Sequence, residues 1–150
     1  WRKGEKSRPL NSKGKKQAQA LPGLIDAFDP TRVLSSPWKR CLATVEPFAR
    51  IEGLTIRTKD ELTEAGAEEH PSRTAAVIER VLHEGRGTVV CTHRPVLPTL
   101  IGAVKKSADR GAEMELPRED PFLAAGEALV LHTTAAGRVV AVERHLPNIA

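Results

Sequence analysis

The sequence predicts an α/β fold, a three-layer α/β/α sandwich around a mostly parallel sheet. Short runs of β-branched residues alternate along the chain with segments whose apolar residues recur at helical spacing. The clearest strand is Thr88–Val90, which leads to His93 and then Pro95. Because Pro95 fits the first turn of a helix, the order there is strand, tight turn, helix. Two further strands, 128–133 and 139–144, flank a short turn and predict a terminal hairpin.

Caps, prolines and apolar spacing give the boundaries of the other elements. The first helix begins with Asn11 or Ser12 as its cap, and Pro22 should kink or split it because proline lacks a backbone N–H. Ser36 can cap the second helix. The expected elements, in chain order, are a helix over 12–28, a strand over 31–35, a helix over 37–53, an edge strand over 54–58, an acidic loop over 60–69, a helix over 71–84, a buried strand over 88–90, a helix from 95, a polar and mobile connection over 105–120, and strands over 128–133 and 139–144.

Length and composition are those of one globular domain. The chain has 150 residues, of which 40% are hydrophobic but only 3% aromatic, so Ala, Val, Leu and Ile must build the core. The scarcity of aromatic residues disfavours the base-stacking surfaces of single-strand-binding proteins. Two cysteines, Cys41 and Cys91, lie inside predicted elements, which suggests buried thiols in a reducing compartment. With no signal peptide or membrane-spanning apolar run, we expect a cytoplasmic location and no membrane partner.

The positive charge is concentrated at the start of the chain. The first 16 residues carry seven Lys and Arg residues against Glu5, whereas the rest of the chain is slightly acidic. A basic run without interleaved aromatic residues is more often solvated than bound to nucleic acid, so no nucleic-acid partner is expected. A smaller anionic ligand is the alternative that this charge leaves open. His70 and His83 show no ligand spacing with a cysteine or another histidine, so no metal site is predicted.

Two strand-to-helix junctions of the same kind carry basic side chains. The first passes through Ser36 and projects Arg40; the second projects His93 and Arg94. Helix amino termini present free N–H groups and guanidinium groups match phosphate geometry, so the two junctions together predict an anion site at the carboxyl ends of the strands. A histidine taken alone would more often cap a helix or pack at the rim of the sheet.

Four motifs in order along nearly the whole chain resemble the signature of the histidine phosphatase superfamily, which has the phosphoglycerate-mutase-like fold. They are Arg8-Pro9-Leu10-Asn11 with Gly14 and Gln17-Ala18, then Ser35-Ser36-Pro37-Trp38-Lys39-Arg40-Cys41 with Thr44, then Leu62-Thr63-Glu64, and finally Cys91-Thr92-His93-Arg94. Within the superfamily the chain most resembles the C-terminal phosphatase domain of two-domain proteins whose first half is a MutT-type Nudix hydrolase. Small phosphohistidine phosphatases come next.

The resemblance implies roles for single residues. Arg40 would be the second phosphate-binding arginine, His93 the second histidine of the pocket, and Glu64 the general acid that protonates the leaving group. Candidates for holding the rest of an anionic substrate are Arg8, Lys39 and Arg94. An exposed surface position would explain the first two equally well.

The nucleophile of this family has no counterpart in the sequence. In the family it is a histidine in an Arg-His-Gly or Arg-His-Ala motif at the end of the first strand, which is internal to the sheet. The resemblance implies that this strand precedes Trp1, so that residues 1–150 form one histidine phosphatase-like domain that is incomplete at its N-terminus. We therefore expect these residues alone to be inactive and of low stability, because an unfilled strand position leaves backbone groups unpaired.

The implied function is hydrolysis of a small phosphorylated, nucleotide-related compound through a phosphohistidine intermediate. The enzyme would be a Nudix-linked hydrolase of oxidised guanine nucleotides or dinucleoside polyphosphates. No cofactor is expected for this domain, and Mg²⁺ only if a Nudix domain is present. The expected partners are the substrate and the N-terminal segment or Nudix domain of the same protein. The alternatives are a stand-alone phosphohistidine protein phosphatase and a non-catalytic anion-binding or docking domain that supports an adjacent catalytic domain.

Overall fold

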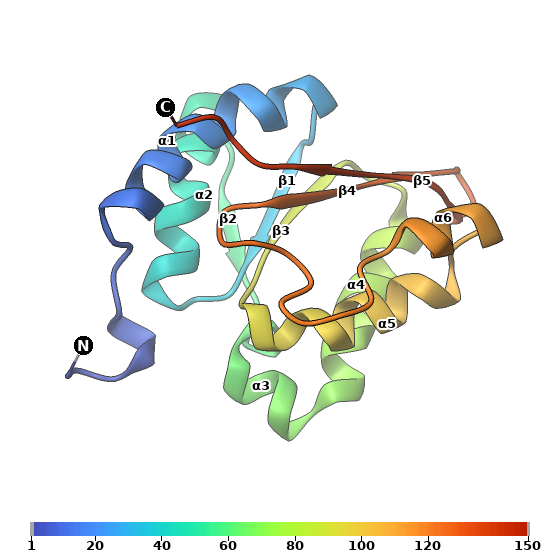
Figure 1. Cartoon of the computed structure of the whole chain (residues 1–150), viewed down its shortest axis with the longest axis horizontal. Coiled ribbons are helices and arrows are strands. Elements are labelled where there is room, and N and C mark those ends of the chain that lie inside the picture. The colour runs from blue at the N-terminus through green and yellow to red at the C-terminus, as the bar shows by residue number, and fades with distance from the viewer. Residues whose placement is uncertain (1, 150) are drawn as a thin grey trace.

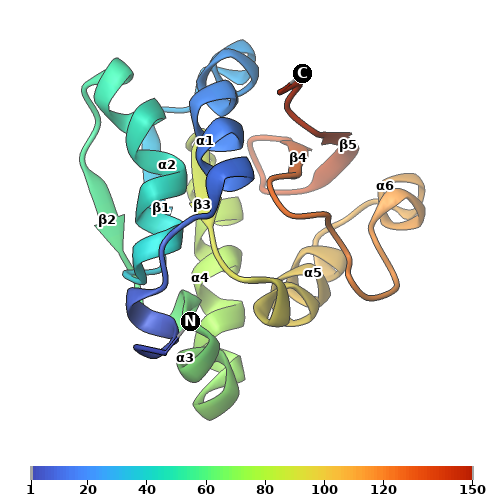
Figure 2. The same ribbon diagram turned by 60° about the vertical axis from the view of Figure 1, so that its left-hand side comes forward.

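Two small sheets and the helices around them make up the structure, a computed structural model that describes residues 2–149 (Figure 1). The first sheet is parallel, with the strand order β2 (Ile56–Thr58), β1 (Arg32–Ser35), β3 (Thr88–Cys91). The second is the antiparallel hairpin of β4 (Ala128–Thr133) and β5 (Val139–His145). Figure 2 shows this hairpin beyond β3, on the side away from β1.

The helices begin and end at residues that satisfy their terminal backbone groups. Asn11 caps the first helix, because its Oδ1 accepts a hydrogen bond of 2.8 Å from the Gly14 N–H. Gly53 ends the second in the left-handed region, with φ 66°. The helices are α1 (Ser12–Ile25), α2 (Lys39–Glu52), α3 (Glu64–Glu69), α4 (Pro71–Glu84), α5 (Leu97–Lys106) and α6 (Arg110–Glu115), with short 3-10 turns η1 (Glu5–Ser7), η2 (Asp26–Phe28), η3 (Asp60–Leu62) and η4 (Arg94–Val96).

The central strand β1 separates two apolar cores. Val33 packs in a cluster with Val45 and Phe48 of α2, whereas its neighbour Leu34 packs in a second cluster with residues of α4 and α5 such as Ile78. This alternation is what a strand covered on both faces requires. The helices therefore form a layer on each side of the parallel sheet, and the predicted three-layer α/β architecture is confirmed.

Strand β3 differs from its prediction. We expected it to be buried on both faces, but each of its four residues is only partly buried. Within the described residues β3 pairs with β1 alone, in a register that sets Ser35 opposite Cys91, and β4 pairs only with β5. One edge of β3 and one edge of β4 thus have no partner strand there, which leaves the side chains of β3 partly open to solvent.

Two segments that the sequence predicted as irregular contain helices. The acidic stretch 60–69 forms η3 and α3, because Thr63 Oγ1 caps α3 by accepting from the Gly66 N–H at 2.9 Å. The stretch 105–120 contains the end of α5 and the whole of α6, which is anchored by buried Ala112 and Leu116. The stretch is therefore not the irregular connection that we expected, because its apolar residues pack against the core and these tertiary contacts hold a helix there.

Pro22 does not split α1. The helix continues to Ile25, and the Asp26 N–H still donates to the Pro22 carbonyl oxygen. Proline removes only its own N–H donor, so the helix loses one hydrogen bond near its C-terminal end. The final turn therefore remains helical.

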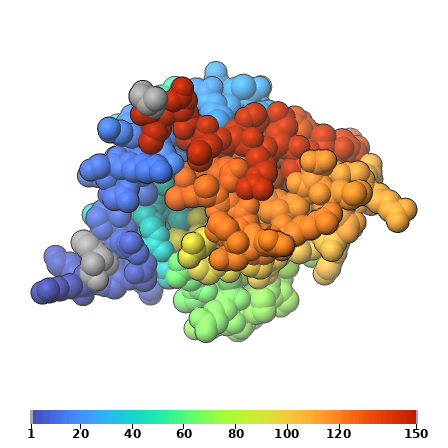
Figure 3. All heavy atoms as spheres, in the orientation of Figure 1, coloured from blue at the N-terminus to red at the C-terminus, as the bar shows by residue number. Residues whose placement is uncertain are grey.

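The surface view separates the basic start of the chain from the rest. Figure 3 shows the N-terminal residues, in blue, projecting at one end, while the orange and red segments that include the hairpin cover much of the visible face. Across residues 2–149, no helix combines the length and apolar character needed to cross a membrane.

Candidate active site

The candidate site lies where β1 and β3 end side by side. Their parallel register sets Ser35 opposite Cys91, and the Ser36 N–H donates to the Cys91 carbonyl oxygen at 3.0 Å. The residues that follow each strand, Ser36 and His93, therefore meet: His93 Nε2 lies 2.8 Å from Ser36 Oγ. The carboxyl ends of parallel strands are where ligands bind in α/β folds.

His93 is held on several sides. It is only 4% exposed, and besides the hydrogen bond to Ser36 its ring centroid lies 4.7 Å from that of Trp38. Ser36 is itself fixed, because it is fully buried and its Oγ also accepts from the Trp38 N–H at 3.2 Å. The imidazole is thus oriented before any ligand arrives.

Arg40 is the second residue of α2 and its guanidinium lies above the same indole, 5.7 Å from the Trp38 ring centroid. Its two terminal nitrogens are bound to two carboxylates: Nη1 lies 3.0 Å from Glu5 and Nη2 3.1 Å from Glu64. Nη1 also donates to the Glu5 carbonyl oxygen. A guanidinium that holds two carboxylates has the geometry to bind phosphoryl oxygens.

Glu64 is brought to Arg40 by the start of α3. It is the first residue of that helix, directly after the Thr63 cap. The turn leaves no room for a side chain at Gly66, since a Cβ there would lie 2.2 Å from the Asp60 carbonyl oxygen. A tight turn that only glycine permits therefore positions the carboxylate.

The remaining predicted residues differ in their positions. Arg8 lies near the site, with Nη1 3.6 Å from the Glu5 carboxylate. Lys39 and Arg94 are exposed, and neither forms an ion pair within residues 2–149. The structure thus brings Arg40 and Glu64 into direct contact, and Trp38 lies between Arg40 and His93. Within residues 2–149, no ion pair links Lys39 or Arg94 to these side chains.

Sequence reasoning missed the side chains between the predicted residues. Ser36 was interpreted only as a helix cap, and Trp38 was given no role, yet these two orient His93. The signal was present in the sequence, because both residues lie in the turn that joins a buried strand to the helix carrying Arg40. Side chains in such a turn face the same sheet edge as the ligand.

Cys41 is the third missed neighbour. Its Sγ lies 3.5 Å from His93 Nε2 and it is 3% exposed. The neighbouring Cys91 thiol, and then His93 and Arg40, lower the pKa of Cys41 to about 5 against the opposing effect of burial. The interaction with Cys41, together with burial, raises the pKa of Cys91. The lowered pKa of Cys41 favours a negative charge on this sulfur, next to His93.

The side chains of the site are suited to anion chemistry. A guanidinium and an imidazole can bind phosphoryl oxygens, and a carboxyl group beside them can donate a proton. In residues 2–149, no three His, Cys, Asp or Glu side chains are arranged to hold a metal ion. The groups that the site offers are therefore a guanidinium, an imidazole and a carboxyl group.

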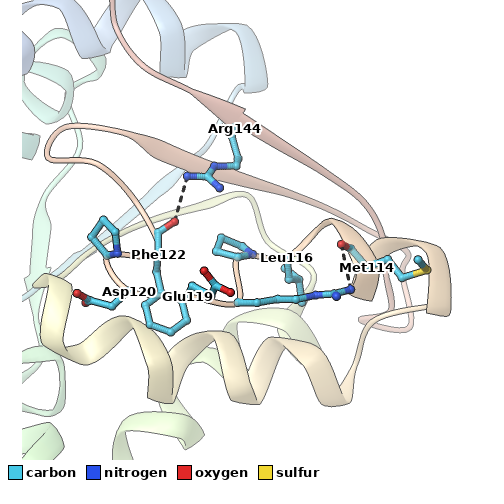
Figure 4. A pocket seen from close by; sticks show the side chains of 9 residues that line it. Met114, Leu116, Glu119, Asp120, Phe122 and Arg144 are labelled. Atoms are coloured by element: carbon cyan, nitrogen blue, oxygen red, sulfur yellow. Dashed lines mark hydrogen bonds between the residues drawn. The ribbon is translucent and has the colours of Figure 1, made fainter.

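A separate pocket is lined by Met114 of α6, residues 116–122 of the loop that precedes β4, and Arg144 of β5 (Figure 4). It has a volume of about 600 Å³ and shares no lining residue with the site at Arg40 and His93. In Figure 4 the Arg144 guanidinium donates to the Phe122 carbonyl oxygen at 3.1 Å, a contact that ties the loop to β5. The pocket is therefore a feature of the loop packing.

Comparison with known proteins finds a family model that matches part of the chain. A family model described as "Histidine phosphatase superfamily (branch 1)" matches residues 2–71. The matched stretch, which is slightly less than half of the chain, is thus similar to the histidine phosphatase superfamily. The matched stretch contains Arg40 and Glu64 and ends before His93.

Individual proteins are also similar to the chain. The 8-oxo-(d)GTP phosphatase of Mycolicibacterium smegmatis (strain ATCC 700084 / mc(2)155) is 34% identical over 98 residues, which is 65% of this chain and 30% of that protein. The chain thus spans less than a third of that curated relative. Among solved structures, the protein histidine phosphatase SixA complexed with tungstate has a TM-score of 0.64 at 20% identity, covering 95% of this chain and 85% of SixA. A SixA-type phosphohistidine phosphatase from Nakamurella multipartitia has a TM-score of 0.63 at 24% identity, covering 98% and 89%. These two structures confirm the phosphoglycerate-mutase-like fold.

Proposed function

We propose that the protein is a phosphatase that removes phosphate from a small phosphorylated compound through a phosphohistidine intermediate. The observation that supports this most strongly is the arrangement of a guanidinium and an imidazole around one indole ring, with Arg40 on Trp38 and buried His93 beside it. Fixed cations that need no reorganisation are what stabilise the charge of a transferring phosphoryl group.

Each residue then has a defined task. Arg40 exchanges a carboxylate for phosphoryl oxygens, and His93, oriented by Ser36, binds another of these oxygens. Glu64 contacts the same guanidinium, so a phosphoryl group bound there lies beside its carboxyl group. From that position Glu64 protonates the oxygen of the leaving group, which otherwise departs poorly.

The attacking histidine, we infer, belongs to a strand outside these 150 residues that pairs with β3. Two observations support this: β3 and β4 each have an edge without a partner strand in the described structure, and the side chains of β3 are only partly buried. A strand between them would join the two sheets into one. His93 is less suited to attack, because Ser36 and Trp38 hold its ring in place as a binding group.

The substrate we propose is nucleotide-related. The support is the 34% identical relative, which is described as an 8-oxo-(d)GTP phosphatase and is far longer than this chain. An oxidised guanine nucleotide or a dinucleoside polyphosphate would suit a protein in which a Nudix domain, with Mg²⁺, precedes this one. A cytoplasmic location fits such a substrate.

Two other functions remain candidates. A phosphohistidine protein phosphatase is favoured by the extent of the structural match to SixA, which covers 95% of the chain. A non-catalytic anion-binding or docking domain would keep the phosphate site and lack turnover. Two measurements distinguish the three functions: which substrates are hydrolysed, and whether there is any turnover at all.

Phosphate release is the first test. The complete protein is assayed with an oxidised guanine nucleotide, a dinucleoside polyphosphate and a phosphohistidine peptide, and we expect the nucleotides to be hydrolysed. Arg40→Ala and His93→Ala each remove one phosphate-binding group, so kcat/KM should fall by about 10²- to 10³-fold. Glu64→Gln removes the proton donor and should lower kcat by about 10²- to 10⁴-fold.

Arg50→Ala is the matched control for this test. Arg50 is exposed, lies on the same helix as Arg40 and is about 15 Å further along it. Its removal should leave kcat/KM unchanged. Hydrolysis of the peptide alone would favour the protein phosphatase, and the absence of all turnover would favour the docking domain.

A further inference from the structure

The two cysteines of the chain lie against each other beneath the candidate site. Cys41 is on α2 and Cys91 is the last residue of β3, fifty residues later. The contacts are reciprocal: Cys91 Sγ lies 3.7 Å from the Cys41 carbonyl oxygen, and Cys41 Sγ lies 3.4 Å from the carbonyl oxygen of Thr92, next to Cys91. Each side chain thus points at the backbone that carries the other.

The surroundings make the two sulfurs unequal. Cys41 Sγ is 3.5 Å from His93 Nε2 and near the Arg40 guanidinium, whose charge helps to lower the pKa of Cys41 to about 5. The pKa of Cys91 is raised. The two pKa values are thus shifted in opposite directions, which favours the thiolate form of Cys41 and the thiol form of Cys91. These are the forms that a thiolate nucleophile and its resolving partner take.

We propose that Cys41 and Cys91 are a redox modification site, in which a peroxide converts the two cysteines reversibly into an intramolecular disulfide. The inference rests on the contact of the two residues and on the position of Cys41 against His93. It goes beyond the phosphatase function and does not depend on it.

The reaction proceeds in two balanced steps. The Cys41 thiolate attacks one oxygen of hydrogen peroxide; the O–O bond breaks, an S–O bond forms and hydroxide leaves, so that Cys41 becomes a sulfenic acid. Cys91 then attacks the Cys41 sulfur; the S–S bond forms, the S–O bond breaks, and the thiol proton leaves with the hydroxyl group as water. Sulfur is oxidised and the peroxide oxygens are reduced, and a dithiol reverses the change.

The disulfide would act on the site through His93. Cys41 Sγ lies 3.5 Å from His93 Nε2. Forming the disulfide turns this sulfur toward Cys91 and removes its negative charge from beside the imidazole. The position of Cys41 directly after Arg40 links the same change to the guanidinium. Oxidation would therefore change the electrostatic environment of His93 and Arg40, the groups proposed to bind the anion.

The test treats the native full chain with a small excess of hydrogen peroxide at neutral pH and follows the intact mass. We expect loss of two hydrogen atoms in the monomer, a peptide linking Cys41 to Cys91 after proteolysis without reduction, and reversal by dithiothreitol. The urea-unfolded chain serves as a control that needs no variant. Because unfolding separates the two sulfurs and returns both to ordinary thiols, its oxidation should be at least about tenfold slower.

Two serine variants assign the roles. Cys91→Ser should stop at a sulfenic acid on Cys41 that dimedone traps, and Cys41→Ser should react at least about tenfold more slowly than the native chain. Equal rates in the native and unfolded chains, a disulfide only between molecules, or fast oxidation of Cys41→Ser would each overturn the proposal. None of these readouts uses phosphatase activity, so a failure of the proposed function would not be mistaken for a failure of the redox site.

Discussion

Ser36 is the residue that best shows how the site is held together. It is fully buried, and its hydroxyl group is shared between the Trp38 N–H and the ring of His93. A buried hydroxyl group with two partners fixes both of them, since losing it leaves polar groups unsatisfied away from water. The orientation of His93 therefore depends on a side chain that need not touch the substrate.

Ser36→Ala should lower both stability and anion affinity. Removing the hydroxyl leaves the His93 nitrogen and the Trp38 N–H without this partner, which should reduce the free energy of unfolding by about 1–3 kcal/mol. Urea denaturation measures this change, and a phosphate titration of the folded variant should show weaker binding. Ser72→Ala, at an exposed position of α4, is the matched control and should change neither quantity. A Ser36→Ala variant with native stability and affinity would show that Ser36 does not position His93.

Single residues of the site could be predicted only in part from the sequence. The positions of Arg40 and His93 followed from strand-to-helix junctions, because local patterns determine where a strand ends. The contacts of Trp38 and Cys41 with His93 join residues more than fifty positions apart, and no local pattern encodes them. The interaction of Glu5 with Arg40 is equally non-local, and the sequence showed Glu5 only as one acid in a basic segment.

At the scale of elements, α3 is the short helix that positions Glu64, the proposed general acid. It has six residues, too few to be stable alone, so it depends on its cap and on the turn before it. Thr63 Oγ1 both donates to the Asp60 carbonyl oxygen at 2.7 Å and accepts from the Gly66 N–H. This tight arrangement explains why an acidic stretch without apolar periodicity still folds into a helix.

Gly66→Ala should therefore disrupt the start of α3. A Cβ at this position would meet the Asp60 carbonyl oxygen at 2.2 Å, and a backbone atom cannot move aside as a flexible side chain could. We expect a loss of at least about 1–3 kcal/mol in the free energy of unfolding, as for other overpacked sites, together with a lower kcat because Glu64 is displaced. Urea denaturation and phosphate-release kinetics measure the two effects.

Gly102→Ala is the matched control for α3, because Gly102 is also helical and a Cβ there would meet no atom within 4 Å. Alanine in a helix is favoured over glycine, so this variant should be as stable as the native chain or more stable by up to about 1 kcal/mol. If both variants lost stability equally, the close approach at Gly66 would not be the cause.

Elements with strong periodicity were predictable and those held by tertiary contacts were not. The helix over 71–84 and the two hairpin strands have the predicted positions, because their apolar spacing is clear along the sequence. α6 was missed: its buried residue Ala112 packs against the core, and the nearby Asp109 N–H donates to the Val139 carbonyl oxygen of β5. Contacts with a strand thirty residues later decide that helix.

At the scale of the whole molecule, the division into two sheets is the main departure from a continuous sandwich. The parallel sheet ends at β3 and the hairpin begins at β4, with no ladder between them in the described residues. Apolar side chains of β4 such as Leu129 and Leu131 nevertheless pack against the core shared by α4 and α5. The two sheets thus share a core without sharing backbone hydrogen bonds.

Hydrogen exchange can test whether a strand fits between the sheets. In the chain of 150 residues, β1 has partners on both edges, so its amides should exchange slowly, whereas alternate amides of β3 face an edge without a partner and should exchange fast. In the protein that includes the proposed strand, all amides of β3 should become protected. Fast exchange of the same β3 amides in that protein would contradict the insertion.

The most direct measurement of the central claim is the binding of an oxyanion at Arg40 and His93. Tungstate, which is bound in the SixA structure, is titrated into the protein by calorimetry. We predict one tungstate per chain, with the affinity weakened about 10- to 100-fold in Arg40→Ala and in His93→Ala because each removes charge-assisted hydrogen bonds, and unchanged in Arg50→Ala. Absence of binding to the native protein, or equal affinity in Arg40→Ala and Arg50→Ala, would contradict the claim that these residues form a phosphate site.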